Sequence, residues 1–173
     1  MNLLREIYDT DVFPDAQNHN PSTFTEKATS RIILLNDLGQ IALLRVGKYN
    51  YHKLPGGGIE NNESPEQALH RELLEEMGRR ARIIAEVGMV IEYKNEQQRK
   101  QTSYCYLGEQ VGEITARHLT ESELAHDYTE IWLDGISPAI AQVESDQPIG
   151  YSRKFIQARE LEFLRAAKAI DSI

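Results

Sequence analysis

The chain has 173 residues, of which 40% are hydrophobic and 27% are charged, a composition typical of a soluble globular protein with one domain. Its formal net charge of −8 disfavours nonspecific binding to nucleic acid or to an anionic membrane, so we expect neither DNA nor a membrane as partner. The single cysteine, Cys105, excludes an internal disulfide and a zinc cluster, and it favours a reducing, cytoplasmic location.

The first 26 residues are mostly polar and contain Pro14 and Pro21. This composition predicts an N-terminal arm, with one short strand near residues 3–8. The segment has neither the apolar core of a signal peptide nor a stretch long enough to span a membrane. The main domain is therefore expected over residues 27–173.

The next elements are expected to be strands. Two runs of β-forming residues, 31–35 and 40–46, flank a turn-like sequence at 36–39, which predicts a hairpin. A short strand is expected at 51–54. Three successive glycines, Gly56, Gly57 and Gly58, follow it, and glycine allows a positive φ or the close approach of a ligand. We therefore predict a ligand-facing loop here.

A helix is predicted from Pro65 onward. Ser64 is a good N-cap, and Gln67 completes a capping box with it. Gly78 can end the helix in the left-handed conformation that other residues avoid. The helix also carries an apolar stripe that predicts burial of one face, formed by Leu69, Leu73 and Met77.

Three acidic residues, Glu72, Glu75 and Glu76, fall on one arc of this helix beside the apolar stripe. Like charges at such spacing destabilise a helix by about 0.2–0.5 kcal/mol per pair. A hard cation such as Mg²⁺ or Mn²⁺ would relieve this repulsion, because such ions prefer oxygen ligands. On the sequence alone, removal of Glu76 is therefore not expected to destabilise the fold.

Further strands are predicted at 81–92, 102–110 and 129–133, with a charged loop at 94–100. Within the second of these, Tyr104, Tyr106 and Gly108 alternate with Cys105 and Leu107, which fits a strand with two different faces. Helices are expected at 136–143 and 150–170. Mixed strands and helices of this kind indicate an α/β or α+β fold.

The segment that starts at the second glycine of the loop resembles the Nudix box, G-x5-E-x7-R-E-U-x-E-E-x-G-U, where U is aliphatic. The matching residues are Gly57, Glu63, Arg71, Glu72, Leu73, Glu75, Glu76 and Gly78. Arg79 stands where the last aliphatic residue is expected. The resemblance covers residues 27 to about 168 and includes Leu54 to Glu60 and Trp132. It implies a Nudix-type α/β/α sandwich with a mixed sheet between helices.

The resemblance also implies a function: a Mg²⁺- or Mn²⁺-dependent pyrophosphohydrolase that cleaves a nucleoside diphosphate linked to a group X. It implies that Glu72 and Glu76 are the principal metal ligands, with Glu75 sharing. Arg71 is expected to orient a box carboxylate, Glu63 or a neighbour, through its two-pronged guanidinium. The backbone of the three glycines is expected to face the metal and the phosphate.

The general base is left open. Glu72 is the first candidate, because a metal-bound water has a lowered pKa and a weak base suffices. In some relatives the base comes from a later loop, and Glu121 or Glu123 fits that place. Both are equally well explained as solvated loop acids.

The substrate is also left open. Residues 93–96 lack the proline typical of ADP-ribose hydrolases, and Gln97 and Gln98 stand where dinucleoside polyphosphate hydrolases have a tyrosine. This modestly favours nucleoside triphosphates, as in MutT-like enzymes. The alternatives are an ADP-ribose or nucleotide-sugar pyrophosphatase, a non-catalytic nucleotide-binding regulatory module, and an isopentenyl diphosphate isomerase that would use Cys105. The N-terminal arm and the last helix are candidate contacts of a homodimer.

Overall fold

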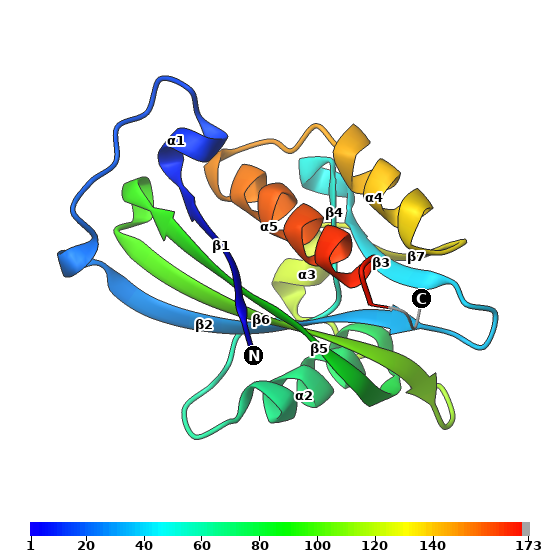
Figure 1. Cartoon of the computed structure of the whole chain (residues 1–173). Helices are drawn as coiled ribbons and strands as arrows, with labels where there is room; N and C mark the ends of the chain where they lie inside the picture. The colour runs from blue at the N-terminus through cyan, green and yellow to red at the C-terminus, as the bar shows by residue number, and fades with distance from the viewer. Residues whose placement is uncertain (171–173) are drawn as a thin grey trace.

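A seven-stranded mixed β-sheet forms the centre of the computed structural model, which describes residues 1–170 (Figure 1). The main path of the sheet runs β1-β5-β6-β2-β3-β4, and β7 pairs with β3. The strands are β1 (Leu3–Tyr8), β2 (Thr25–Leu35), β3 (Ile41–Val46), β4 (Tyr51–Lys53), β5 (Arg80–Lys94), β6 (Arg99–Val111) and β7 (Tyr128–Leu133).

Helices lie on both faces of this sheet: in Figure 1, α2 lies below it, while α4 and α5 lie above it. The helices are α1 (Asp9–Val12), α2 (Pro65–Met77), α3 (Glu121–Ala125), α4 (Ile136–Ser145) and α5 (Tyr151–Ala167). One-turn 3₁₀ helices occur at Pro21–Thr23, Gly47–Tyr49 and Asn95–Gln97. The predicted mixed sheet between helices is confirmed. No helix within residues 1–170 is long and apolar enough to cross a membrane.

The glycine loop occupies a gap that opens between β2 and β3. These two strands pair at only one position, Leu35 with Ile41, and then diverge. The loop pairs with the free edge of β2 instead: Ser30 N donates to the carbonyl of Gly57 at 2.9 Å, and Ile32 N donates to the carbonyl of Pro55 at 3.1 Å. The loop backbone is thereby fixed by the sheet, which gives the site a rigid base.

Each face of the sheet has its own apolar core. Ile32 and Leu34 of β2 pack with the α2 stripe of Leu69, Leu73 and Met77. Leu69 is fully buried, which is worth about 1.5–3 kcal/mol for a side chain of this size. The opposite core includes Cys105 and Leu107 of β6 with residues of α4 and α5, whereas Tyr104 and Tyr106 face α2. The predicted two-faced strand is confirmed.

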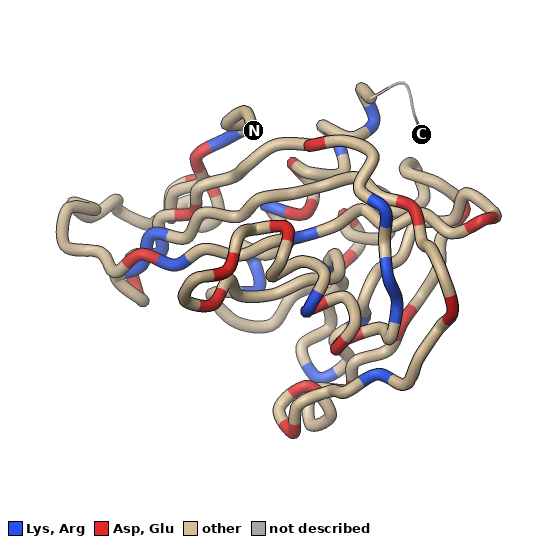
Figure 2. The backbone as a smooth tube through the Cα atoms, turned by 90° about the horizontal axis from the view of Figure 1, so that it is seen from below, with Lys and Arg blue, Asp and Glu red and all other residues tan. Residues whose placement is uncertain are grey.

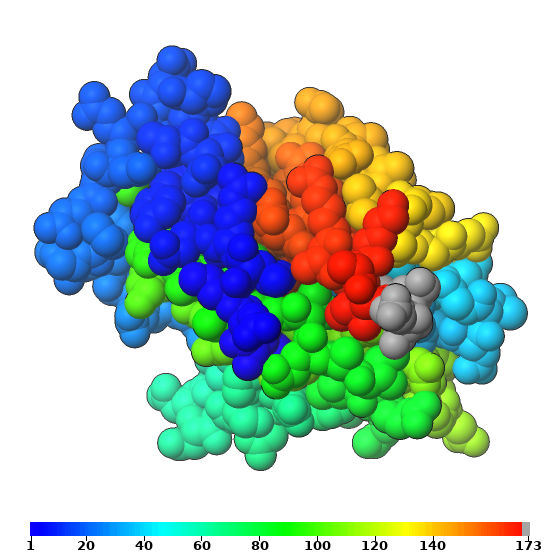
Figure 3. All heavy atoms as spheres, in the orientation of Figure 1, coloured from blue at the N-terminus to red at the C-terminus, as the bar shows by residue number. Residues whose placement is uncertain are grey.

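The N-terminal segment takes part in this fold. Strand β1 runs parallel to β5, from Leu3 opposite Met89 to Tyr8 opposite Tyr93. The ring of Phe13 stacks on that of Tyr151 in α5 at 5.2 Å between centroids. Figure 3 shows these first residues, in blue, lying against α5 and the central strands. The strand near residues 3–8 is confirmed, while the domain boundary at residue 26 stays a prediction, and residues 171–173 of the predicted domain lie outside the described residues.

Two short helices were not expected from the sequence. Helix α1 continues directly from β1, and α3 lies in a segment that was predicted only as a loop carrying Glu121 and Glu123. Helix α3 begins with Thr120, whose side chain accepts a hydrogen bond from Glu123 N. A Thr-x-x-Glu capping box therefore marks this helix, as it does many others.

Candidate active site

Helix α2 presents the acidic arc toward the glycine loop, and the two approach very closely. A Cβ atom added at Gly57 would overlap the carboxylate of Glu72. Gly56 has a φ of +123°, and a Cβ there would overlap the carbonyl of Ser30. Gly57 is therefore required by the space that the Glu72 carboxylate occupies, and Gly56 by its backbone conformation and its close approach to β2.

Arg71 binds three box acids at once. Its Nε and Nη2 donate to the two oxygens of Glu63 at 2.8 and 3.0 Å, so the predicted two-pronged pair is confirmed. Its Nη1 also donates to Glu72 at 3.0 Å and to Glu75 at 3.2 Å. Nη2 further donates to the carbonyl of Gly58 at 2.9 Å. Arg71 thus ties the helix to the glycine loop.

The surroundings of Glu63 and Glu72 shift the pKa values of these two carboxyl groups in opposite directions. The hydrogen bonds from Arg71 lower the pKa of Glu63 to about 2. Burial, and then the negative charge of Glu76, raise the pKa of Glu72 despite its contact with Arg71. The pocket around Glu72 and Glu76 consequently favours the arrival of a further positive charge.

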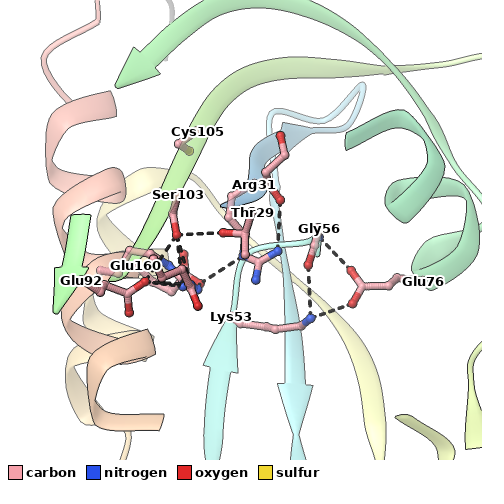
Figure 4. A network of polar contacts seen from close by, with 12 residues as sticks. Thr29, Arg31, Lys53, Gly56, Glu76, Glu92, Ser103, Cys105 and Glu160 are labelled. Atoms are coloured by element: carbon pink, nitrogen blue, oxygen red, sulfur yellow. Dashed lines mark hydrogen bonds and ion pairs between the residues drawn. The ribbon is translucent and has the colours of Figure 1, made fainter. Parts of the chain in front are cut away.

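Glu76 is buried and already has a cationic partner, Lys53, at the end of β4 (Figure 4). Lys53 Nζ lies 2.6 Å from Glu76 Oε1. The amide of Gly56 donates to Glu76 Oε2 at 2.8 Å. Burial, the largest single effect, lowers the pKa of Lys53, but the charge of Glu76, the nearby Tyr128 and the hydrogen bond to Glu76 together raise it further, so the net shift is upward and the lysine is protonated. This pair was not predicted, although a lysine directly before a glycine loop was a visible signal.

A second buried cation, Arg31 of β2, lies behind the loop. Its Nη1 donates to the carbonyl of Ser30 at 3.0 Å, and its Nε lies 3.8 Å from Glu160 of α5. Burial, followed by the charge of Arg159, lowers the pKa of Arg31. Figure 4 shows that a chain of polar contacts extends from this side of the sheet to Glu92 and Glu160.

The two later acids do not reach the box acids in this structure. Glu123 Oε2 accepts hydrogen bonds from the amide and hydroxyl of Thr120 at 2.7 and 2.8 Å, so it caps α3. Glu121 is exposed. Within residues 1–170, neither carboxylate forms a hydrogen bond or ion pair with a box residue. Their catalytic role stays a prediction.

A cavity of about 470 Å³ lies beside the box. Its wall includes Tyr49, Tyr51, Glu123, His126, Tyr128 and Arg153. Lys53 links this cavity to the box acids, because the ammonium group that pairs with Glu76 also lies 5.0 Å from the centre of the Tyr128 ring. The guanidinium of Arg153 stacks over Tyr49 at 3.8 Å. Two larger cavities, of about 620 and 500 Å³, lie at α1 and α5 and beside the turn that follows β2. None of the three cavities is lined by a box residue, and the contact of Lys53 with both Glu76 and Tyr128 is what singles out the smallest of them.

Arg79, the departure from the box pattern, is accommodated by other polar groups. It pairs with Glu130 Oε1 at 2.5 Å and donates to Gln110 at 2.8 Å. Its guanidinium also lies 5.1 Å from the centre of the Trp132 ring. The stacked guanidinium covers the apolar surface that an aliphatic residue would cover, so the end of α2 remains packed.

The donor atoms fit a hard divalent cation. Three carboxylates and the carbonyl of Gly56 are oxygen ligands of the type that Mg²⁺ and Mn²⁺ prefer. In the structure Arg71 Nη1 bonds to Glu72 and Glu75 while Lys53 bonds to Glu76, and within residues 1–170 no three acidic, His or Cys side chains converge on one point. The residues that would hold the ion are Glu72, Glu75 and Glu76, as predicted, and this assignment stays a proposal.

Cys105 and His52 are structural in this arrangement. Cys105 lies in the core that faces α5, on the other side of the sheet from α2, and burial raises the pKa of its thiol well above the usual range. It is thus remote from the box, which removes the support for an isomerase. His52 Nδ1 lies 2.7 Å from Asp146 Oδ1, and its amide donates to Asp146 Oδ2 at 2.6 Å.

Comparison with known proteins agrees with this arrangement. A family profile described as NUDIX domain matches residues 25–144. Because the match covers more than half of the chain, the chain belongs to the NUDIX domain family.

Curated relatives match over part of the chain. An RNA pyrophosphohydrolase from Ectopseudomonas mendocina (strain ymp) is 51% identical over 47 residues, which cover 27% of this chain and 30% of the relative. An RNA pyrophosphohydrolase from Pectobacterium atrosepticum is 41% identical over 68 residues, 36% of this chain and 37% of the relative. The chain therefore matches about a third of the length of these relatives.

Solved structures share the fold across most of the chain. The E. coli ORF135 protein has a TM-score of 0.57 at 22% identity, with 86% of this chain and 96% of that chain covered. An ADP-ribose pyrophosphatase from Streptococcus suis has a TM-score of 0.53 at 18% identity, with coverage of 84% and 95%. At such low identities these likenesses establish the fold alone.

Proposed function

We propose that this protein is a divalent-cation-dependent pyrophosphohydrolase that cleaves a nucleoside diphosphate linked to a group X, with a modest preference for nucleoside triphosphates. The observation that carries the proposal is the position of Glu72, Glu75 and Glu76 on one arc of α2, facing the glycine loop and held by Arg71. A non-catalytic regulatory module has no need of this complete set.

The protein groups have separate tasks in this proposal. Glu72, Glu75 and Glu76 would hold Mg²⁺ or Mn²⁺, which supplies charge neutralisation for the phosphates and lowers the pKa of an attacking water. Glu72 would accept the proton of that water, because a water whose pKa the metal has lowered needs only a weak base. Arg71 would keep the carboxylate in place through its bonds to Glu63 and Gly58.

The cavity beside the box is the place proposed for the nucleoside. Tyr49, Tyr51 and Tyr128 offer aromatic surface, and Arg153 adds a guanidinium face over Tyr49. Rings of this kind bind a base by stacking without strict selection among bases. The volume of about 470 Å³ falls in the range of small-molecule sites, about 300–1,000 Å³.

The relatives named RNA pyrophosphohydrolase suggest a triphosphorylated RNA end as an alternative substrate. The charge of this chain disfavours that choice. Figure 2 shows Lys and Arg positions interspersed with Asp and Glu positions, and the net charge is −8. An RNA chain needs several phosphate contacts from basic residues, whereas a free nucleotide needs few. We therefore favour the free nucleotide.

The test is a substrate panel with Mg²⁺. It contains nucleoside triphosphates, ADP-ribose, nucleotide sugars and a 5′-triphosphorylated RNA oligomer, with released phosphate and pyrophosphate measured. We expect turnover of a triphosphate to a nucleoside monophosphate, with little activity on ADP-ribose. A kcat/KM for ADP-ribose or RNA that is about tenfold above that of every triphosphate, about 1.4 kcal/mol in transition-state stabilisation, would reject the substrate preference.

Two variants separate chemistry from binding. Glu72→Gln should lower kcat by about 10²–10⁴, the usual contribution of a general base, with little change in KM. Glu121→Gln, which changes an exposed acid of α3, tests the alternative base. If Glu121→Gln were the slow variant and Glu72→Gln the normal one, the base would be assigned to α3.

A further inference from the structure

Lys53 stands where a divalent cation would bind. Its Nζ lies 2.6 Å from Glu76 Oε1 and 3.4 Å from the carbonyl oxygen of Gly56 (Figure 4). Both atoms belong to the oxygen set that fits Mg²⁺ or Mn²⁺. The ammonium group therefore contacts the same two oxygen atoms that a metal ion at this site would bind.

Lys53 and a metal on Glu76 would repel each other. A divalent ion binds carboxylate oxygen at about 2.0–2.1 Å, so an ion on Oε1 would lie within a few ångström of an ammonium group that is 2.6 Å from the same oxygen. Only 8% of the Lys53 side chain and 2% of the Glu76 side chain are exposed, so solvent screens this repulsion poorly.

The lysine also has an alternative place to go. Its Nζ already lies over the ring of Tyr128, 5.0 Å from the ring centre, and Tyr128 lines the cavity beside the box. A shift of the flexible side chain toward that ring would keep a favourable cation–π contact while it frees Glu76.

We propose that Lys53 is a built-in competitor of the catalytic cation: it occupies Glu76 and the Gly56 carbonyl in the metal-free protein, and it must leave them when the metal binds. Lys53 consequently sets the metal affinity of the site, and it turns toward the Tyr128 cavity as the metal enters. This inference rests on the proposed metal-dependent function.

Isothermal titration calorimetry with Mn²⁺ and no nucleotide tests the inference. Lys53→Met removes the competing charge, and Lys53→Gln removes it while keeping a donor for Glu76. Both variants should bind Mn²⁺ about tenfold more tightly than the wild type. Lys100→Met, which removes a lysine that pairs with Glu26, should leave the affinity unchanged.

A second measurement separates a change in metal affinity from poor folding of Lys53→Met. Saturating Mn²⁺ should raise the melting temperature of each Lys53 variant more than that of the wild type, because tighter binding gives larger stabilisation. If the wild type binds Mn²⁺ and neither Lys53 variant binds it more tightly, Lys53 is not a competitor and only this inference fails. If the wild type and both variants all fail to bind Mn²⁺, the proposed function fails together with it.

Discussion

The carboxylate of Glu76 is bound by a buried ammonium group and a backbone amide, which changes what its removal should do. The sequence predicted only repulsion among acids, and hence no loss of stability without Glu76. The structure shows instead that Lys53 depends on it, with 8% of the lysine side chain exposed. That expectation did not include this pair, because Lys53 lies 23 positions away and no local pattern joins the two residues.

Glu76→Gln should therefore lower the free energy of unfolding by about 3–5 kcal/mol, because it leaves a buried lysine without its counter-charge. Urea denaturation in a metal-free buffer measures this loss. The double variant Lys53→Met/Glu76→Gln should recover most of the loss. Glu75→Gln is the control: its side chain is 46% exposed and it should cost less than about 1 kcal/mol. Equal losses of unfolding free energy in Glu76→Gln and Glu75→Gln would contradict a stabilising role of the buried Lys53–Glu76 pair.

Glu63 gives the site a pH dependence. Its pKa is about 2 in the folded protein, chiefly through the hydrogen bonds from Arg71, against 4.5 for an ordinary glutamate. The folded state thus favours the charged form, so the stabilisation is complete above pH 4.5 and is lost as the pH falls toward 2. Glu63→Gln cannot ionise. The difference in unfolding free energy between wild type and Glu63→Gln, measured by urea denaturation, should shrink over that interval, and a constant difference would contradict the pair.

Helix α2 shows what the sequence predicts well at the scale of an element. Its N-cap Ser64, its capping box with Gln67 and its left-handed Gly78 are all confirmed. These signals are local: the side chains of Ser64 and Gln67 bind backbone amides three residues away, and the Gly78 amide donates to carbonyls four and five residues before it. Helix α3 carried the same kind of signal in Thr120 and Glu123, but it was missed because Glu121 and Glu123 were interpreted only as acids of a loop.

The two ends of α2 should differ in sensitivity. Ser64→Ala removes one exposed cap and should cost about 0.5–2 kcal/mol. Gly78→Ala should cost more, since φ is +63° there and the new Cβ would overlap the carbonyl of Thr115. Thermal unfolding of both variants shows which substitution destabilises the protein more. Gly39→Ala, at φ +73° but with nothing near its Cβ, isolates the backbone cost from the overlap.

At the scale of the whole molecule, the unpredicted features are those that join distant segments. The hairpin signal at 36–39 correctly indicated the turn, but not that β2 and β3 would pair at one position and then admit the glycine loop between them. The parallel pairing of β1 with β5 likewise joins residues about 85 positions apart, which no local pattern encodes. The candidate acids could be predicted because they share one helix.

A buried ionic cluster fixes α5 to the sheet, and its members come from three segments of the chain. Arg159 Nη1 pairs with Glu92 of β5 at 3.0 Å, and its Nη2 pairs with Glu160 at 2.6 Å. Glu92 also pairs with Lys94 at 3.0 Å. Arg31 of β2 approaches Glu160, so the cluster extends toward the glycine loop. Arg159 is thus the cation that two buried carboxylates share.

Arg159→Met should destabilise the protein by about 3–5 kcal/mol, because it strands Glu92 and Glu160 in the interior. Arg165→Met on the same helix removes an exposed arginine, paired with Glu144 and 51% exposed, and should cost less than about 1 kcal/mol. Urea denaturation gives both values. Amide hydrogen exchange should show the loss of protection first in α5 and β5, the elements that Arg159 joins. Similar costs for the two variants, or a loss of protection confined to α2, would show that α5 is held by its apolar face alone.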